Sequence, residues 1–328
     1  MTEPTTDRRR FFSRLVDDIP RLFREVSEVL QEGIAAVGVG ETSVLPEPLP
    51  APWLVQPQAV THTASVDELV ALADEEGLQH QHAALVDLAR SSIRITAAGD
   101  GDAVGAQLGG PTEPDESDRT WRVLAQIELV DPTLSGSGLP STGRMTVGVK
   151  TAREIVGFES ACTEACVTFA SGEPGGYGAT RAGFAGRLSA ELTLPRVWSA
   201  SVQRLELDEH DHEGYVRLRQ RLAELQGVVA EERGGHGVAD HHLLGYPTET
   251  SGSMPLLCEL AARGLDAASA DTDDDLLLAA ERWRLLLQVS CDERSGIDLG
   301  QGLERVYCWI ADEDLMAGEF SRVWTIFR

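Results

Sequence analysis

The sequence predicts an α+β fold that is β-rich, with a mostly antiparallel sheet or roll, an internal duplication and a helical N-terminal arm. Three observations predict it. Short apolar or alternating runs bounded by turn residues recur beyond residue 90, which is typical of hairpins. One strand–loop–strand pattern occurs twice. The regular alternation of strands and helices that would indicate a parallel sheet is lacking.

Residues 1–43 are predicted to form an amphipathic helical arm, which Pro20 would kink or split. Each large apolar side chain gains about 1.5–3 kcal/mol when it is buried. We therefore expect the arm to dock on the body, on a second copy or on an unknown protein partner. A membrane surface is disfavoured because six acidic and six basic residues balance over residues 7–32. The expected contact residues are Phe11, Leu15, Ile19, Leu22 and Val26.

Five prolines within residues 44–60 predict an extended linker. Residues 61–328 then form the predicted β-rich domain, with halves at about 61–160 and 165–328. The expected helices cover 66–90, where Ser65 is the N-cap, then 214–231, 255–264 and 273–284. The expected strands cover 93–96, 104–109, 122–130, 143–149, 186–194 and 285–291, and a later strand carries Tyr307 and Trp309.

The repeated pattern predicts that the two halves are related. The run around Gln126 is followed by a loop and the strand 143–149, and about 160 residues later the run around Gln288 is followed by a loop and Arg305–Ile310. Two such units can bury their apolar faces in one core. A buried glutamine amide needs hydrogen-bond partners. Each glutamine therefore either holds a neighbouring loop or contacts a ligand.

Four segments together resemble the YwqG-like family, a bacterial family of unknown function, over about residues 90–327. They are Leu108–Pro111 with Trp121, Leu192–Pro195, His241–Pro247 and Trp283–Trp324. The resemblance implies a soluble, β-rich α+β protein built on a duplication, and it implies no agreed reaction, cofactor or catalytic set. The chain departs from the family pattern at Thr250–Ser253 and at Leu299–Gly302.

Composition favours an acidic, soluble, cytoplasmic protein. The formal net charge of −25 disfavours nucleic acid and could favour basic partners. Three of five cysteines lie in apolar runs, which indicates reduced core residues. Arg8–Arg10 resembles a twin-arginine export signal, but acidic residues follow in place of an apolar region. An apolar run of 18 residues is lacking, so we expect no membrane span.

The predicted function is a non-enzymatic binding or protein-interaction module with no cofactor. A groove between the halves is the expected binding surface. The glycine-rich turn at its edge lacks the lysine of a P-loop and the spacing of a dinucleotide site. The candidate groove residues are Gly109, Gly110, Pro111, Trp121, Gln126, His241, His242, Tyr246, Gln288 and Trp309.

The alternative is a hydrolase or metal-dependent enzyme in which His241 or His242 acts with nearby carboxylates. A Gly-x-Ser-x-Gly elbow is lacking, and we assign no catalytic residue. Cys162 and Cys166 are spaced to share a helical face, but a structural zinc needs four ligands. The run Asp208–Glu213 could bind a divalent ion but is better interpreted as a solvated turn before a helix. We therefore expect no metal.

Overall fold

The computed structural model describes residues 60–109, 121–150, 163–170, 183–197, 199–228, 240–248, 253–265, 274–291, 297 and 305–328. The chain divides into two compact units, Met1–Pro52 and Trp53–Arg328, and every described residue belongs to the second. The predicted arm, with its contact residues Phe11 to Val26, lies outside the described residues. The predicted domain boundaries therefore stay predictions.

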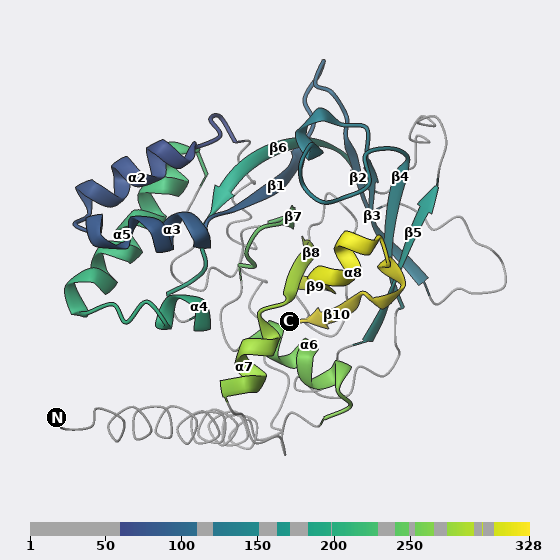
Figure 1. The fold of residues 1–328 in the computed structure, drawn as a ribbon. Helices are drawn as coiled ribbons and strands as arrows, with labels where there is room; N and C mark the ends of the chain where they lie inside the picture. Colours follow the sequence, from purple (N-terminus) through teal and green to yellow (C-terminus); the bar gives the residue numbers. More distant parts are fainter. Residues whose placement is uncertain are drawn as a thin grey trace, which may run out of the picture. The chain divides into compact units, whose positions relative to one another are not determined.

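The strands of the described part form one closed antiparallel barrel (Figure 1). Its order is β1-β6-β2-β3-β4-β5-β10-β9-β8-β7, and β7 pairs with β1 to close the ring. This confirms a β-rich, antiparallel α+β architecture. The strands are β1 Arg90–Ala97, β2 Ala106–Leu108, β3 Trp121–Glu128, β4 Arg144–Lys150, β5 Thr163–Ala170, β6 Phe184–Thr193, β7 His242–Leu244, β8 Trp283–Ser290, β9 Arg305–Ala311 and β10 Trp324–Phe327.

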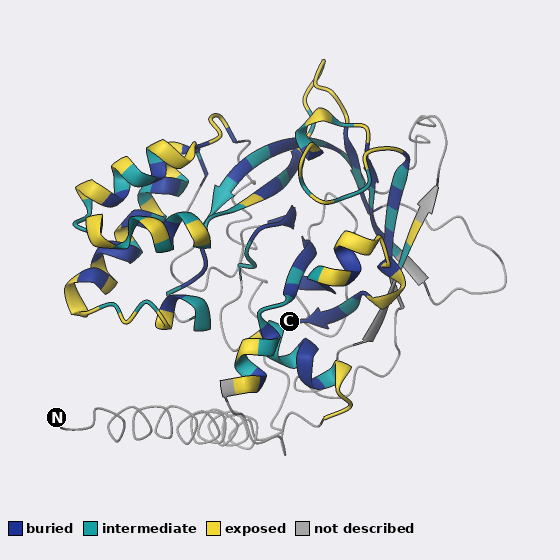
Figure 2. Cartoon of the chain, in the orientation of Figure 1, coloured by how far each residue is buried: buried dark blue, intermediate teal, exposed yellow. Residues whose placement is uncertain are grey.

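Helices flank the barrel. In Figure 2 the longer helices α2 and α5 show buried residues on one side and exposed residues on the other, as amphipathic helices do. None of the described helices is long and apolar enough to cross a membrane. The α-helices are α2 Val66–Glu75, α3 His82–Leu88, α4 Ala200–Gln203, α5 Glu209–Leu225, α6 Met254–Ala262, α7 Asp274–Ala280 and α8 Asp312–Ala317.

Three apolar clusters stabilise this arrangement. The largest draws residues from strands all around the ring, such as Ile95 and Leu188, and therefore fills the barrel. A second joins α2, α3 and α5, with Tyr215 fully buried in it. A third packs α6 on β8, β9 and β10, and it contains Trp283 and Trp309. Each buried side chain of this size contributes about 1.5–3 kcal/mol.

Alternation of side chains along a strand puts a row of mainly polar residues on the outer face of the barrel. The row crosses β6, β1, β7, β8 and β9 at directly paired positions. Its members are Ser189, Arg94, His242, Gln288 and Tyr307. Their strand neighbours Ile93, Leu243 and Leu287 point into the barrel core. Arg94 and His242 of this row line the pocket described below.

Several predicted boundaries are wrong for tertiary reasons. The helix predicted over 66–90 is divided near Gly77, which has a φ of 82°, and Arg90 already pairs with β6. The helix predicted over 273–284 ends at Ala280 because Trp283 pairs with β9. Asp208 is the N-cap of α5, so the acidic run forms the first turn of this helix and does not precede it. Strands β5, β7 and β10 had not been predicted.

The hairpins β3–β4 and β8–β9 match position by position. In each, the register shifts once, just before Ala125 and just before Leu287, so Gln126 and Gln288 occupy the same place. Three cross-strand pairs of the first hairpin correspond to three pairs of the second. Trp121 opposite Lys150 corresponds to Trp283 opposite Ala311. Gln126 opposite Thr146 corresponds to Gln288 opposite Tyr307, and Glu128 opposite Arg144 corresponds to Ser290 opposite Arg305.

The strands beside these hairpins match as well. β2 places Gln107 beside the glutamine of the first hairpin, and β7 places His242 beside that of the second. Two residues after Gln107 and two residues after His242 the backbone is left-handed, with a φ of 64° at Gly109 and 60° at Leu244. β6 pairs with β2 and β1 pairs with β7. If the chain is divided after β5, β1 is the first strand of one half and β6 the first strand of the other. Each of these two strands therefore pairs with a strand of the opposite half.

Candidate functional site

A buried charged network lies where β1, β6 and β7 meet. Arg94 donates from Nε to Glu191 Oε2 at 2.8 Å and from Nη1 to Asp240 Oδ1 at 2.7 Å. Both carboxylates are only 3% exposed. Burial alone would raise the pKa of Asp240, but the charge of Arg94, followed by those of His242 and Arg305, outweighs burial and holds this pKa well below its usual range. Asp240 is therefore ionised at neutral pH.

Gln288 ties the loop after β7 to this network. Its side-chain amide accepts from the backbone N–H of Thr248 at 2.9 Å and donates to Thr248 Oγ1 and to Asp240 Oδ2. Arg305 donates to the carbonyl oxygen of Thr248 at 3.0 Å. Since Gln288 is fully buried, these bonds satisfy an amide that would otherwise be costly to bury. Holding a loop is one of the two roles considered for this glutamine.

The two neighbouring histidines contact the backbone. His242 Nε2 donates to the carbonyl oxygen of Tyr246 at 3.2 Å, and its Nδ1 lies 3.4 Å from Asp240 Oδ2. His241 Nδ1 accepts from the backbone N–H of Ser290 at 3.3 Å. The Ser290 hydroxyl donates to the backbone oxygen of Asp240 at 2.9 Å. Both rings are therefore fixed by the strands around them.

Tyr246 connects the same loop to the helical layer. Its hydroxyl donates to the carbonyl oxygen of Leu88 at 2.8 Å, and the Arg90 guanidinium lies 4.4 Å from the centre of its ring. Burial raises the pKa of Tyr246, so the hydroxyl keeps its proton and remains a donor. The preceding residue, Gly245, has a φ of 68°, and a Cβ there would meet the Cβ of Ser92 at 2.5 Å. Glycine is thus required for the turn.

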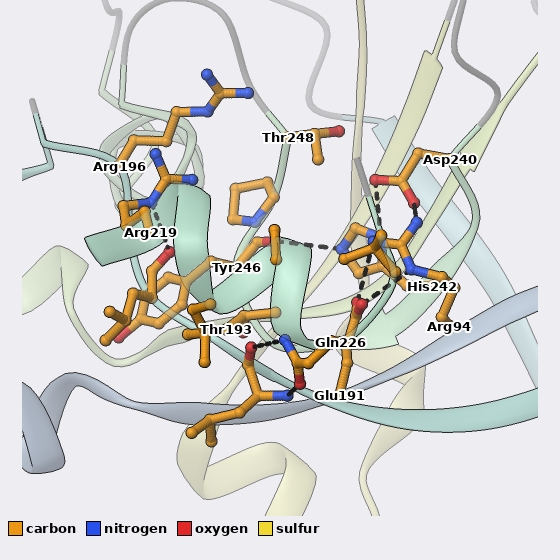
Figure 3. A pocket seen from close by; sticks show the side chains of 16 residues that line it. Arg94, Glu191, Thr193, Arg196, Arg219, Gln226, Asp240, His242, Tyr246 and Thr248 are labelled. Carbon is orange, nitrogen blue, oxygen red and sulfur yellow. Dashed lines mark hydrogen bonds and ion pairs between the residues drawn. The ribbon is translucent and has the colours of Figure 1, made fainter. Parts of the chain in front are cut away.

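A pocket of about 100 Å³ lies between α5 and the strands β1 and β6, beside the loop after β7 (Figure 3). The wall on the barrel side contains Arg94, Asp240 and His242. The C-cap of α5, Gln226, also lines it, and its side-chain amide bonds to both the N–H and the carbonyl oxygen of Leu192, at 2.6 and 3.0 Å. These two bonds fix the spacing between α5 and β6.

The structure brings together part of the predicted groove. His242 and Tyr246 line the pocket, and His241 and Gln288 belong to the adjoining network. Gln126 lies on β3 in the other half, and Trp309 lies in the apolar cluster under α6. Gly109 follows β2. Gly110 and Pro111 lie outside the described residues, as does the side chain of Trp121, whose backbone begins β3.

Sequence reasoning did not single out the charged members of the site. Arg94 and Asp240 are 146 positions apart, and only the pairing of β1 with β7 brings them together. The available signals were a charged residue inside the apolar run Ile93–Ile95 and an acid directly before His241. Glu191 and Arg219 carried no distinguishing pattern.

The described residues contain no group of three or more His, Cys, Asp or Glu side chains that could hold a metal ion. Cys166 lies on strand β5, so the helical face expected for it is wrong, and Cys162 lies outside the described residues. Cys258 and Cys308 are buried. Burial raises the pKa of Cys308 to about 12, which leaves it an unreactive thiol at neutral pH.

Comparison with protein families places most of this site within a known domain. A family model described as a domain of unknown function, DUF1963, matches residues 111–328. Because this is well over half of the chain, the protein belongs to the DUF1963 family. Comparison with curated proteins found no match. The matched region includes Asp240, His242, Gln288 and Arg219, whereas Arg94 precedes it.

Proposed function

We propose that this chain is a non-enzymatic binding module whose ligand site is the pocket between α5 and strands β1, β6 and β7. One observation carries the proposal: the buried polar groups beside the pocket hold one another and the adjacent loop. A preformed pocket with a few convergent polar groups is the usual form of a small-ligand site. Such a site loses little conformational freedom on binding, which favours affinity.

The geometry favours binding over the alternative, a hydrolase or metal-dependent enzyme that uses His241 or His242. A general base needs a ring nitrogen that can accept a proton from the substrate. His242 Nε2 instead donates to the Tyr246 carbonyl oxygen, and Nδ1 faces a carboxylate. The Ser290 hydroxyl is bonded to the backbone of Asp240 and is not placed as a nucleophile activated by His242.

The proposal is tested by mapping small-molecule binding on the ¹⁵N-labelled full chain by NMR. Binding to the pocket should shift the backbone signals of Gln226 and Thr248, and the bound compound should be recovered unchanged. A generic ester assay on wild type and His242→Gln tests the alternative. Turnover that disappears with His242→Gln would contradict the proposal and support the hydrolase.

The proposal includes a second contact surface on the arm. Its stripe of Phe11, Leu15, Ile19, Leu22 and Val26 would bind an unknown protein partner or a second copy of the chain. The variant Leu15→Glu should reduce self-association measured by light scattering, or abolish co-purification of a partner. If neither changes, the arm is not a contact surface. We place this module in the cytoplasm because reduced, buried cysteines suit that compartment, and we expect no nucleic-acid binding because the net charge is −25.

We further propose that the two halves arose by duplication and that the chain is YwqG-like. Support comes from the equal register of the two hairpins, the matching glutamines and the left-handed residue two positions after Gln107 and after His242. A local resemblance of two hairpins by chance would not extend to the neighbouring strands. Comparison of the halves in an experimental structure of a second family member would test this origin.

A further inference from the structure

We propose that a carboxylate group of a small ligand binds at Arg90, on the outer face of β1. This inference does not rest on the proposed pocket, which Arg90 does not line. The starting observation is an arginine without an ion pair. The partly buried guanidinium of Arg90 lies 4.4 Å from the centre of the Tyr246 ring, and within the described part of the chain it pairs with no carboxylate. A partly buried charge normally has a partner of opposite sign. The lack of one is unexpected in a chain with 53 acidic residues against 28 lysines and arginines.

The charges around Arg90 leave its own charge as a surplus. Burial lowers the pKa of Arg90, and among the neighbouring cations Arg284 lowers it further. Two carboxylates, Asp312 and Glu281, act in the opposite direction. Each of them already has an arginine of its own, since Asp312 pairs with Arg284 and Glu281 pairs with Arg204. An arginine keeps its proton at neutral pH, so two neutral pairs surround one positive charge that is not balanced.

The guanidinium of Arg90 is placed to bind an oxyanion with its edge. Ile93 and Ile95 belong to the barrel core, so the alternation along β1 directs Arg90 outward. The Tyr246 ring lies against the guanidinium, and this ring is held because its hydroxyl donates to the carbonyl oxygen of Leu88 at 2.8 Å. The five N–H donors of a guanidinium lie in its plane. A ring against the face therefore leaves the planar fork for the two oxygens of a carboxylate.

The surroundings of Arg90 decide which oxyanion fits. The neighbouring side chains of Arg284 and Asp312 are 32% and 33% exposed, so a small ligand can reach the site from solvent. One surplus positive charge matches the single charge of a carboxylate, whereas a phosphate monoester carries about −1.5 to −2. A large acidic partner would be repelled by the net charge of −25. A small ligand is affected less, because charges farther away than about 8 Å are largely screened at physiological ionic strength.

The test is an NMR titration of the ¹⁵N-labelled full chain with sodium acetate at constant ionic strength, with sodium chloride as the reference salt. We expect acetate to give saturable shifts at the Arg90 Nε–H and at the backbone amide of Tyr246, and chloride to give neither. A parallel titration with inorganic phosphate tests the choice of oxyanion. Phosphate should bind more weakly than acetate, and tighter binding of phosphate would overturn the assignment of a carboxylate.

Arg90→Gln should weaken acetate binding about tenfold or more, measured at the Tyr246 amide, because it removes the charged donor. The matched control is Arg187→Gln, which removes a charge from β6 at a side chain that is 43% exposed and lies 3.9 Å from Asp102. This control should bind within about twofold of wild type, since exposed charges are well screened. If thermal unfolding shows that Arg90→Gln is not folded, Arg90→Lys replaces it and should bind more weakly than wild type because the planar fork is lost.

Three further results would contradict a carboxylate site at Arg90. Acetate shifts no larger than those with chloride would mean that the guanidinium only packs on Tyr246. Equal affinity of wild type and the Arg90 variant would mean that acetate binds elsewhere. Shifts centred on Gln226, which lines the pocket, that persist in the Arg90 variant would place acetate in the pocket. That last result would overturn this inference and support the proposed function, so the failure of one is distinguished from the failure of the other.

Discussion

The hairpins β3–β4 and β8–β9 have the same backbone register but different chemistry on their outer faces. In the first, Arg144 pairs directly with Glu128 across the strands, with Nε to Oε1 at 2.6 Å. In the second, the matching positions are Arg305 and Ser290, and Arg305 instead donates to the loop at Thr248. A cross-strand ion pair in one half corresponds to a network that holds a loop in the other.

The neighbouring strands extend this difference. Where the first half has Gln107 on β2, the second has His242 on β7, and two positions earlier Gly105 corresponds to Asp240. The scaffold therefore repeats, while the buried Asp240 and His242 of the second half stand where the first half has Gly105 and Gln107. Backbone pairing determines where side chains lie, and a few substitutions at matching positions decide whether a site forms there.

The largest effect is expected for Asp240→Ala, because it leaves Arg94 and His242 buried beside a missing carboxylate. Breaking a buried ion pair by removing one partner costs about 3–5 kcal/mol. Urea denaturation of the full chain measures the loss in free energy of unfolding. The comparison variant is Glu128→Ala in the first hairpin, whose partner Arg144 is 23% exposed at its side chain. A cost for Asp240→Ala no larger than that for Glu128→Ala would contradict the comparison.

Gly245→Ala should be the next most damaging change. It places a side chain at a φ of 68° and a Cβ 2.5 Å from that of Ser92, which together cost about 2–4 kcal/mol. Gly264→Ala is the control, since Gly264 has a φ of 67° and nothing within 4 Å of its Cβ position. Its cost should be about 1–2 kcal/mol. Equal melting temperatures for the two variants would show that the turn after β7 tolerates crowding.

Gln288→Ala should cost about 1–3 kcal/mol, because it leaves the backbone N–H of Thr248 without its acceptor. Hydrogen exchange at the Thr248 amide should accelerate in this variant. Gln126→Ala, at the matching position of the first hairpin, should leave that amide unchanged. Unchanged exchange in Gln288→Ala would mean that the loop is held by other contacts.

The smallest effect is the dependence of stability on pH. The pKa of Asp240 is lowered in the folded protein relative to 3.8, so its contribution is complete above about pH 4–5 and is lost as the pH falls below the unfolded value. Asp240→Asn removes this contribution. The difference in free energy of unfolding between wild type and Asp240→Asn should therefore shrink from pH 5 to about pH 2. A difference that is constant across this range would contradict an ionised Asp240.

Sequence patterns predicted the α+β class and the longer strands other than β5, because the alternation around Gln126 and Gln288 is a local property. They missed β7 and β10, since three or four residues are too few to show a period of two. They extended the helix at 273–284 because helix propensity did not reveal that Trp283 pairs with β9.

The residues of the candidate site also fall into those that sequence patterns could single out and those that they could not. Gln288 could be singled out because it interrupts an apolar run, and His241 and His242 because they directly precede one. Arg94 and Asp240 could not be joined, because their contact depends on β1 pairing across the halves with β7. Arg219 is one of several arginines along α5, and only the packing of that helix distinguishes it.

The most direct test of the central claim, that the ligand site lies beside β7 and not at the matching place beside β2, is NMR titration of the ¹⁵N-labelled full chain with small molecules. We predict shifts at the Arg219 Nε–H and at the amides of Thr248 and Gln226, and none at Gln107 or Gln126, the matching positions of the first half. Shifts of equal size in both halves, or shifts at Gln107 and Gln126 alone, would contradict the account.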